Sequence, residues 1–274
     1  MTTRPLILLT NDDGFDSPGL IAAAAALMPL GELLIAAPLV RQSGMGRSWP
    51  PHSTGIIHRR EIRIDGASLS AYAVDGSPAQ VVAHALLELA PRLPDLAVSG
   101  INYGENLATA VTSSGTVGAA MEAAITGLRS MAISLEVDKK YFHDPSDQVD
   151  FSAAAHFAGL FAERLLFLPR LPPDVDLLKI DVPRDATPET SWEITRQSRR
   201  PYFVSVGVER SALDAPGRVD YTMDPSTSEP GTDTHTLAFG KRVSVTPLSV
   251  DLTSRTDLDA LGQMLSNGRY PSSA

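Results

Sequence analysis

Residues 6–19, LILLTNDDGFDSPG, decide the fold class because they join a buried strand to the beginning of a helix. The apolar run from Leu6 to Thr10 has the length and composition of a strand that is buried on both faces. Ser17 can cap the helix that Pro18 opens, since the missing N–H of proline costs nothing at the first helical position. This order of elements predicts the start of an alternating α/β fold.

Two adjacent carboxylates, Asp12 and Asp13, stand where this strand ends. Like charges so close together raise each other's pKa unless a positive group lies between them. Asn, Asp and Gly are also common turn residues that tolerate left-handed backbone, so the stretch taken alone is more often a simple turn. The rest of the chain has to decide between a turn and a cation site.

Short apolar strands alternate with helical patterns along residues 1–183. This alternation is typical of a doubly wound, mostly parallel sheet with helices on both faces, and we predict one α/β core over this range. The expected strands are residues 6–10, 32–37, 56–64, 69–74, 95–99, 131–135 and 177–182, and the expected helices are 18–27, 78–90, 116–125 and 150–168.

The segment after Pro183 has a different composition. Residues 184–240 are polar and rich in Pro, Gly, Ser and Thr, and they are too long for an ordinary connection. We predict an extended arm here that either covers the site or reaches another subunit. Residues 241–274 are expected to return to the core. The expected elements after Pro183 are strands at 192–196, 202–208, 234–239 and 241–246, and a last helix from a Thr256 cap to about Leu265.

Composition limits the class of function. The formal net charge is −9, and no Lys- or Arg-rich block supplies the basic face that duplex nucleic acid requires. No window approaches a membrane span, the first apolar run is too short for a signal peptide, and the absence of Cys excludes thiol nucleophiles and zinc–thiolate sites. We therefore expect a cytoplasmic protein without a membrane partner. A small anionic substrate would need a bound cation or a nest of backbone N–H groups.

Polar residues follow three of the predicted strands, and ligands of open α/β sheets bind beyond the carboxyl ends of the strands. The first strand is followed by Asp12 and Asp13, the second by Ser43, and the strand at 95–99 by Asn102. Ser43 and Asn102 can each be simple turn residues. Independent turns, however, would scatter over both ends of the sheet. All four side chains offer hard oxygen donors, which suit Mg²⁺ or Mn²⁺.

Other catalytic motifs fit poorly. Gly44-Met45-Gly46 opens no helix and lacks the third glycine of a dinucleotide fingerprint. The chain has no Walker lysine after a Gly-rich loop and no G-x-S-x-G elbow. Ser114-Gly115-Thr116 can be a simple helix cap, but the same N-terminus also presents N–H groups to an anion.

Four motifs together resemble the SurE family of stationary-phase survival proteins, which are metal-dependent nucleoside monophosphate phosphatases. They are NDDG at 11–14, RQSGMG at 41–46, VSGINYGEN at 98–106 and SGTVGAAME at 114–122. VDGSPAQVV at 74–82 and SVTPLSVDLT at 244–253 resemble further family motifs, so the resemblance spans almost the whole chain.

The resemblance implies a Rossmann-like core and a C-terminal hairpin arm that is exchanged between subunits to form dimers or tetramers. It also implies a phosphomonoesterase for nucleoside 5′- or 3′-monophosphates with one Mg²⁺ or Mn²⁺ per subunit. The implied metal ligands are Asp12, Asp13, Ser43 and Asn102. Asp12, Asp13 and Asn102 are also the expected catalytic residues, and Asp13 is one candidate for a general base. The expected substrate- or phosphate-binding residues are Asn11, Gly44, Asn106, Ser114, Gly115 and Thr116.

Two positions depart from the family pattern. Ser113 stands where relatives usually carry Tyr or His, which predicts a roomier pocket entrance with weaker discrimination among nucleobases. Lys179 and Asp181 stand in a stretch where the family has asparagines. The alternative to an enzyme is a non-catalytic metal- or nucleotide-binding sensor that assembles through the arm.

Overall fold

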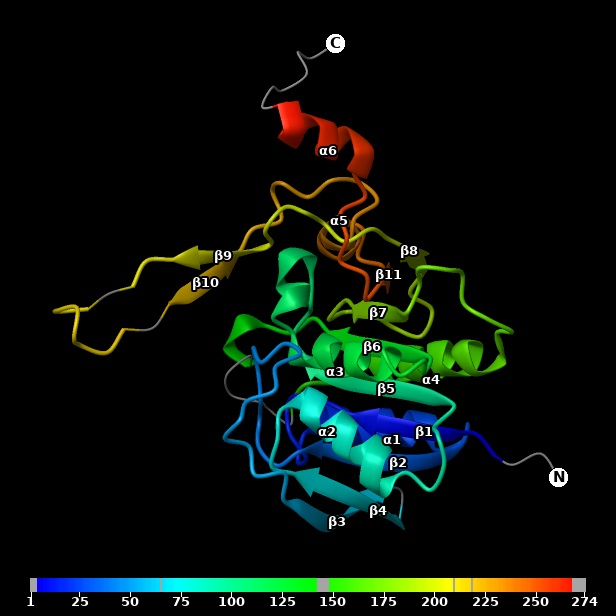
Figure 1. The fold of residues 1–274 in the computed structure, drawn as a ribbon. Coiled ribbons are helices and arrows are strands. Elements are labelled where there is room, and N and C mark those ends of the chain that lie inside the picture. The colour runs from blue at the N-terminus through cyan, green and yellow to red at the C-terminus, as the bar shows by residue number, and fades with distance from the viewer. Residues whose placement is uncertain (1–3, 65, 142–147, 209, 218, 268–274) are drawn as a thin grey trace.

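The computed structural model describes residues 4–64, 66–141, 148–208, 210–217 and 219–267, and its centre is one nine-stranded sheet (Figure 1). The strand order is β3-β4-β2-β1-β5-β6-β7-β11-β8. Neighbouring strands are parallel except for the β3–β4 and β7–β11 pairs, which confirms the predicted mostly parallel α/β fold. The strands are β1 Leu6–Thr10, β2 Glu32–Pro38, β3 Ile57–Ile64, β4 Ala67–Val74, β5 Leu96–Tyr103, β6 Ser130–Leu135, β7 Leu177–Val182, β8 Trp192–Ile194 and β11 Val243–Leu248.

Helices cover both faces of the sheet. On one face α1 (Pro18–Leu27) and α4 (Ser152–Phe167) pack together over the larger apolar core. On the other face α2 (Pro78–His84), which continues as a π-turn, packs with α3 (Gly115–Ala124). The two buried layers explain why the central strands are apolar on both sides.

Short local signals begin the helices where the sequence predicts them. Ser77 and Gln80 form a reciprocal capping box at the start of α2. Ser17 occupies the N-cap position of α1, although its hydroxyl makes no capping bond. The last helix, α6 (Leu258–Asn267), begins differently from the expectation: the Asp257 carboxylate, not Thr256, accepts a bond from the Ala260 N–H (3.0 Å).

Within the predicted arm, one part does not join the main sheet. Strands β9 (Phe203–Val206) and β10 (Asp220–Met223) pair antiparallel as a separate hairpin that projects to the left in Figure 1. Strand β8, by contrast, joins the edge of the main sheet beside β11. The limits 1–183, 184–240 and 241–274 remain a prediction.

The strand predicted at 234–239 is wrong, because this segment forms helix α5 (Asp233–Ala238). Its β-branched and aromatic residues favour a strand by propensity alone. The Thr232 hydroxyl nevertheless caps the helix by accepting the His235 N–H, and the Asp233 side chain is drawn into a buried ion pair with Lys179. Local capping and a tertiary charge pair override the propensity of these residues.

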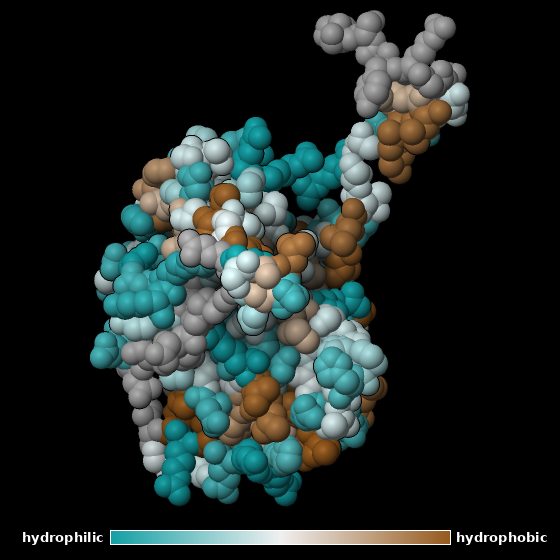
Figure 2. All heavy atoms as spheres, turned by 90° about the vertical axis from the view of Figure 1, so that its left-hand side faces the viewer, coloured by the Kyte–Doolittle hydropathy of each residue, from teal (hydrophilic) through white to brown (hydrophobic). Residues whose placement is uncertain are grey.

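Helix α6 lies at the end of the described chain, apart from the main body (Figure 1). Its apolar residues Leu258, Leu261 and Leu265 are exposed, and Figure 2 shows this apolar surface separated from the rest of the molecule. None of the helices in the described part of the chain has the length and apolar character that a membrane crossing requires.

Candidate active site

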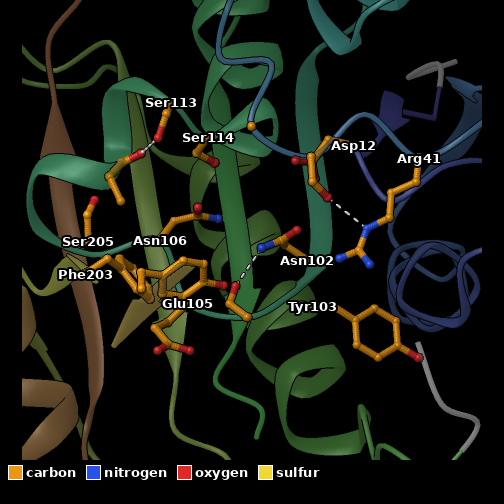
Figure 3. Close-up of a pocket in the computed structure, with 15 residues that line it drawn as sticks. Asp12, Arg41, Asn102, Tyr103, Glu105, Asn106, Ser113, Ser114, Phe203 and Ser205 are labelled. Carbon is orange, nitrogen blue, oxygen red and sulfur yellow. Dashed lines mark hydrogen bonds between the residues drawn. The ribbon is translucent and has the colours of Figure 1, made fainter. Parts of the chain in front are cut away.

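A cleft of about 400 Å³ opens where β1, β2 and β5 end, at the edge of the sheet that the sequence predicts (Figure 3). The three strands are adjacent in the sheet, so the loops that follow them meet. Six predicted site residues line the cleft: Asp12, Ser43, Gly44, Asn102, Asn106 and Ser114. The other four, Asn11, Asp13, Gly115 and Thr116, are buried.

The chain turns sharply after β1 because Gly14 adopts a left-handed conformation (φ 97°). The Asn11 amide nitrogen donates to the Gly14 carbonyl (2.9 Å) and closes the turn. The Gln42 N–H donates to the Asp12 carbonyl (2.7 Å), which ties this turn to the loop after β2. A side chain at position 14 would also press on the Arg41 backbone, so glycine meets two requirements at once.

Asp12 lies against the N-terminus of α3. The Thr116 hydroxyl donates to its carboxylate, and a Cβ atom at position 115 would lie 2.7 Å from the Asp12 Cβ atom. Only glycine permits this approach of the helix to the carboxylate. Burial raises the pKa of Asp12, and the Thr116 bonds and the Arg41 charge oppose the rise only in part.

Asp13 is held from two sides. The Tyr103 N–H donates to its Oδ2 atom (2.9 Å), and the Arg41 guanidinium lies 3.1 Å from its Oδ1 atom. Burial, followed by the negative charge of Asp12, raises the pKa of Asp13 to about 7. The pair is therefore two buried carboxylates that oppose each other's ionisation.

Arg41 is a site residue that sequence reasoning missed. Besides its ion pair with Asp13, its Nε atom donates to the Ser43 hydroxyl (2.8 Å), so it connects the loops after β1 and β2. It also lines the cleft. The available signal was a basic residue two positions before a predicted ligand in an acidic chain.

Asn102 stands at an irregular point of β5, where the pairing with β6 shifts register between Ser99 and Asn102. Its amide nitrogen donates to the Gly104 carbonyl (2.6 Å). In Figure 3 the amide oxygen consequently points to the side of the cleft on which Asp12 lies.

The donor set fits a divalent cation. Asp12, Asp13, Ser43 and Asn102 together offer two carboxylates, a hydroxyl and an amide oxygen, which are the ligands that Mg²⁺ and Mn²⁺ prefer. A cation would also relieve the raised pKa values of the two buried carboxylates. The described residues contain no group of three or more His, Cys, Asp or Glu side chains able to hold a metal, and this set of two carboxylates with two neutral donors is consistent with that finding.

The family assignment rests on a match over most of the chain. Residues 7–203 match the family described as "Survival protein SurE". The chain belongs to the SurE family. The resemblance drawn from the four motifs is thereby confirmed.

Curated relatives and a solved structure agree with this assignment. The chain is 42% identical to "5'-nucleotidase SurE" of Thermococcus gammatolerans, over 96% of this chain and 98% of the relative. It is 44% identical to "5'-nucleotidase SurE" of Archaeoglobus fulgidus, over 92% of this chain and 94% of the relative. Its fold is similar to the crystal structure of the SurE protein from Aquifex aeolicus, with a TM-score of 0.75 and 30% identity over 97% of this chain and 100% of that one.

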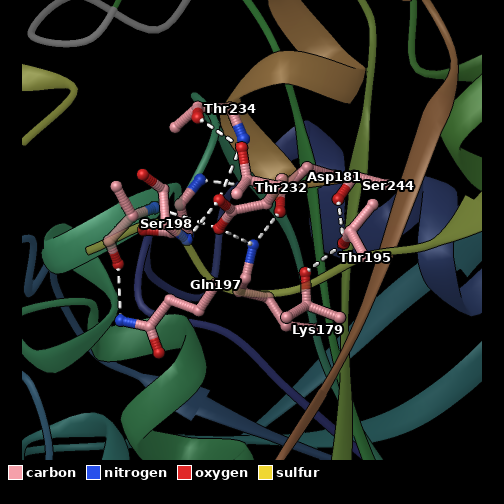
Figure 4. Close-up of polar contacts among 12 residues, drawn as sticks. Lys179, Asp181, Thr195, Gln197, Ser198, Thr232, Thr234 and Ser244 are labelled. Carbon is pink, nitrogen blue, oxygen red and sulfur yellow. Dashed lines mark hydrogen bonds and ion pairs between the residues drawn. The ribbon is translucent and has the colours of Figure 1, made fainter. Parts of the chain in front are cut away.

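A buried ion-pair cluster supports the loop that carries Asn106. The Asn106 N–H donates to Asp181 (2.7 Å), and its amide nitrogen donates to the Ser134 hydroxyl (2.9 Å). Asp181 in turn pairs with Lys179, whose ammonium also lies 3.2 Å from Asp233 of α5 (Figure 4). The two departures from the SurE pattern at Lys179 and Asp181 are thus partners in one cluster beneath this SurE site.

Further residues that line the cleft were not predicted from the sequence, and four of them are Glu105, Phe203, Ser205 and Tyr221. Glu105 is buried, and this burial, followed by the charges of Glu136 and Asp181, raises its pKa to about 8. The other three come from the β9–β10 hairpin. No local pattern links the NDDG turn at 11–14 to a hairpin that begins at residue 203, so only the tertiary fold reveals these three residues.

Proposed function

We propose that this SurE-family chain is a divalent-metal-dependent phosphomonoesterase that hydrolyses nucleoside 5′- or 3′-monophosphates to nucleoside and phosphate. The observation that carries the proposal is the buried Asp12–Asp13 pair at the end of β1, beside a cleft that Asp12, Ser43 and Asn102 line. The curated relatives that cover nearly the whole chain are named 5'-nucleotidases, which supports the same activity.

Asp12, Asp13, Ser43 and Asn102 would hold one Mg²⁺ or Mn²⁺ ion. A divalent cation supplies positive charge for phosphoryl oxygens and makes water more acidic near neutral pH. Both oxygens of Asp13 already face positive or N–H groups, from Arg41 and Tyr103. We therefore assign Asp13 to holding the cation rather than to the general-base role for which the sequence made it one candidate.

The phosphate would bind between the loop after β2 and the start of α3. The Ser114 hydroxyl accepts the Val117 N–H (3.1 Å), so its own proton is available for a phosphoryl oxygen. The backbone N–H groups of Gly44 and Gly115 are the further candidates, because the N-terminus of α3 favours an anion. The hydroxyl and the backbone N–H of Thr116 both donate to the Asp12 carboxylate, so Thr116 contributes to phosphate binding only indirectly.

Asparagine substitutions at Asp12 and Asp13 test the proposal. Each variant should release no phosphate from AMP above background and should bind Mg²⁺ or Mn²⁺ more weakly in calorimetry, because a charged ligand is lost. Folding should be unimpaired, since one of two opposed charges has been removed. The exposed Asp16→Asn is the matched control and should behave as wild type.

Three outcomes would contradict this proposal. Near wild-type turnover by either variant, or full activity of the wild type in EDTA, would show that the metal site is wrong. Binding of metal and AMP by the wild type without phosphate release would establish the non-catalytic sensor instead.

A proposal for assembly starts from the β9–β10 hairpin, which forms a two-stranded sheet of its own. Val204 and Val206 lie on one face of β9 and are exposed (37% and 41%). We propose that this apolar face pairs with another subunit to form a dimer or tetramer. Sedimentation velocity at micromolar concentration should show the oligomer, and Val206→Asp should shift it toward the monomer. A wild-type monomer would refute the assembly.

A further inference from the structure

We propose that the β9–β10 hairpin forms an aromatic wall of the cleft on which the nucleobase of the substrate stacks, with Phe203 as the stacking residue. This inference deepens the proposed function and rests on it. The wall consists of Phe203, Ser205 and Tyr221, all of which line the same cleft as Asp12 and Ser43.

Strand geometry places these three residues on one face of the hairpin. Phe203 and Ser205 are two positions apart on β9, so their side chains lie on the same side. Tyr221 of β10 is directly opposite Ser205 in the register. Val204 and Val206 therefore lie on the opposite face, away from the cleft.

The ring of Phe203 is held in a defined orientation. It packs edge-on against Tyr202 (centroids 4.9 Å apart, 86°) and against Tyr221 (5.4 Å, 89°). Tyr202 hydrogen-bonds Glu105 in the loop after β5, and the Lys139 ammonium pairs with Asp220 (2.8 Å) and lies 5.0 Å from the Tyr221 ring centroid. The hairpin is thus attached to the core at both strands.

The two ends of the cleft differ in chemistry, and so do the phosphate end and the base end of a nucleotide. Figure 3 shows Asp12 at one side and Phe203 at the other, with Asn106 and Ser114 between them. The first end presents carboxylates, Ser43 and the α3 N-terminus, which suit a cation and a phosphate. The second end presents a half-buried aromatic ring beside the Ser205 hydroxyl, which suits a planar base attached to a ribose.

Stacking does not depend on the hydrogen-bonding edge of the base. Every nucleobase has an aromatic face, so such a wall binds purines and pyrimidines with limited discrimination. The wall should therefore matter for any nucleotide, and it should not matter for a phosphomonoester that has no base.

The test compares AMP and UMP with ribose 5-phosphate, using Phe203→Leu, Phe203→Tyr and the control Phe167→Leu, which makes the same change at an exposed ring at the end of α4. Phe203→Leu should raise KM for AMP and UMP by about tenfold, the usual effect of losing one stacked ring, while kcat stays close to wild type. KM for ribose 5-phosphate should not change. Phe203→Tyr keeps the ring and should restore nucleotide binding, and Phe167→Leu should resemble wild type.

Saturation-transfer NMR with adenosine and uridine provides a readout that does not need turnover. Both nucleosides should contact the wild type and should lose most of this signal with Phe203→Leu. If the wild type hydrolysed none of the phosphates, the proposed function would be wrong. Nucleoside binding measured by NMR would still test whether Phe203 stacks on the base. Equal losses for AMP and ribose 5-phosphate, or unchanged nucleoside binding by Phe203→Leu, would overturn the inference.

Discussion

Replacing Lys179 with methionine would leave two buried carboxylates, Asp181 and Asp233, without the cation that both contact. All three side chains are fully buried, and the ammonium lies 3.2 Å from Asp233 and closer to Asp181. Although burial lowers the pKa of Lys179, the charges of Asp181 and Asp233 raise it above its ordinary value. Lys179 is therefore charged in the folded protein at neutral pH.

Removing one partner from a buried ion pair costs about 3–5 kcal/mol, because the remaining charge cannot regain water. Backbone N–H groups from Asn106, Ala108 and Ser198 soften this cost, since they donate to the two carboxylates (2.7, 3.0 and 2.9 Å). We therefore expect Lys179→Met to lower the free energy of unfolding by about 3 kcal/mol, at the lower end of this range. For a domain of this size, 1 kcal/mol corresponds to about 2–4 °C, so the melting temperature should fall by about 10 °C.

Calorimetry or circular dichroism at pH 7 measures this change. Lys140→Met is the control, because Lys140 is exposed and lies 3.8 Å from Asp138, and its melting temperature should stay within about 2 °C of wild type. Adding Asp233→Asn to Lys179→Met should recover part of the loss, since one uncompensated charge is removed. A Lys179→Met protein that melts with the wild type would show that charge pairing does not hold this cluster together.

Three further predictions concern the cleft. The pKa of Glu105 is raised to about 8, so the folded protein holds a proton that the unfolded chain releases near pH 4.5. The free energy of unfolding should therefore fall as the pH rises from 5 to 8. Urea unfolding of Glu105→Gln should show a flatter dependence on pH than that of the wild type. Thr116→Val removes the hydroxyl bond to Asp12 and should raise the pKa of Asp12 further. Mg²⁺ binding measured by calorimetry should therefore weaken more at pH 6 than at pH 8. Equal weakening at the two pH values would refute this effect on the pKa of Asp12. Ser113 lines the cleft with a small side chain, so kcat/KM for AMP, GMP, CMP and UMP should agree within about tenfold, and a sharp preference for one base would contradict this reasoning.

Sequence patterns alone predicted the α/β core and the location of the site. Strands and helices of the core follow from short apolar runs and from Ser-Pro openings such as Ser77-Pro78, which act within a few residues. The edge of the sheet at which the site lies follows from topology, because the carboxyl ends of parallel strands meet at the same edge. Asp12, Ser43 and Asn102 therefore converge without any knowledge of distances, as the cleft confirms.

Long-range contacts decided what local patterns could not. Arg41 bridges Asp13 and Ser43, and Thr116 bonds Asp12 across 104 residues of chain. The segment at 234–239 has strand propensity, yet a cap and the buried pairing of its neighbour Asp233 make it a helix.

The β9–β10 hairpin is the clearest case in which local patterns do not identify residues of the cleft. Alternation along residues 203–206 predicts a strand, but it carries no information about which face meets a cleft built by residues near position 12. Periodicity and capping are local properties, so sequence patterns were sufficient for the strands and helices of the core and for their order, but not for α5. Charge pairing and aromatic packing between distant segments depend on how these elements meet, so the side chains that complete the cleft are visible only in the folded chain.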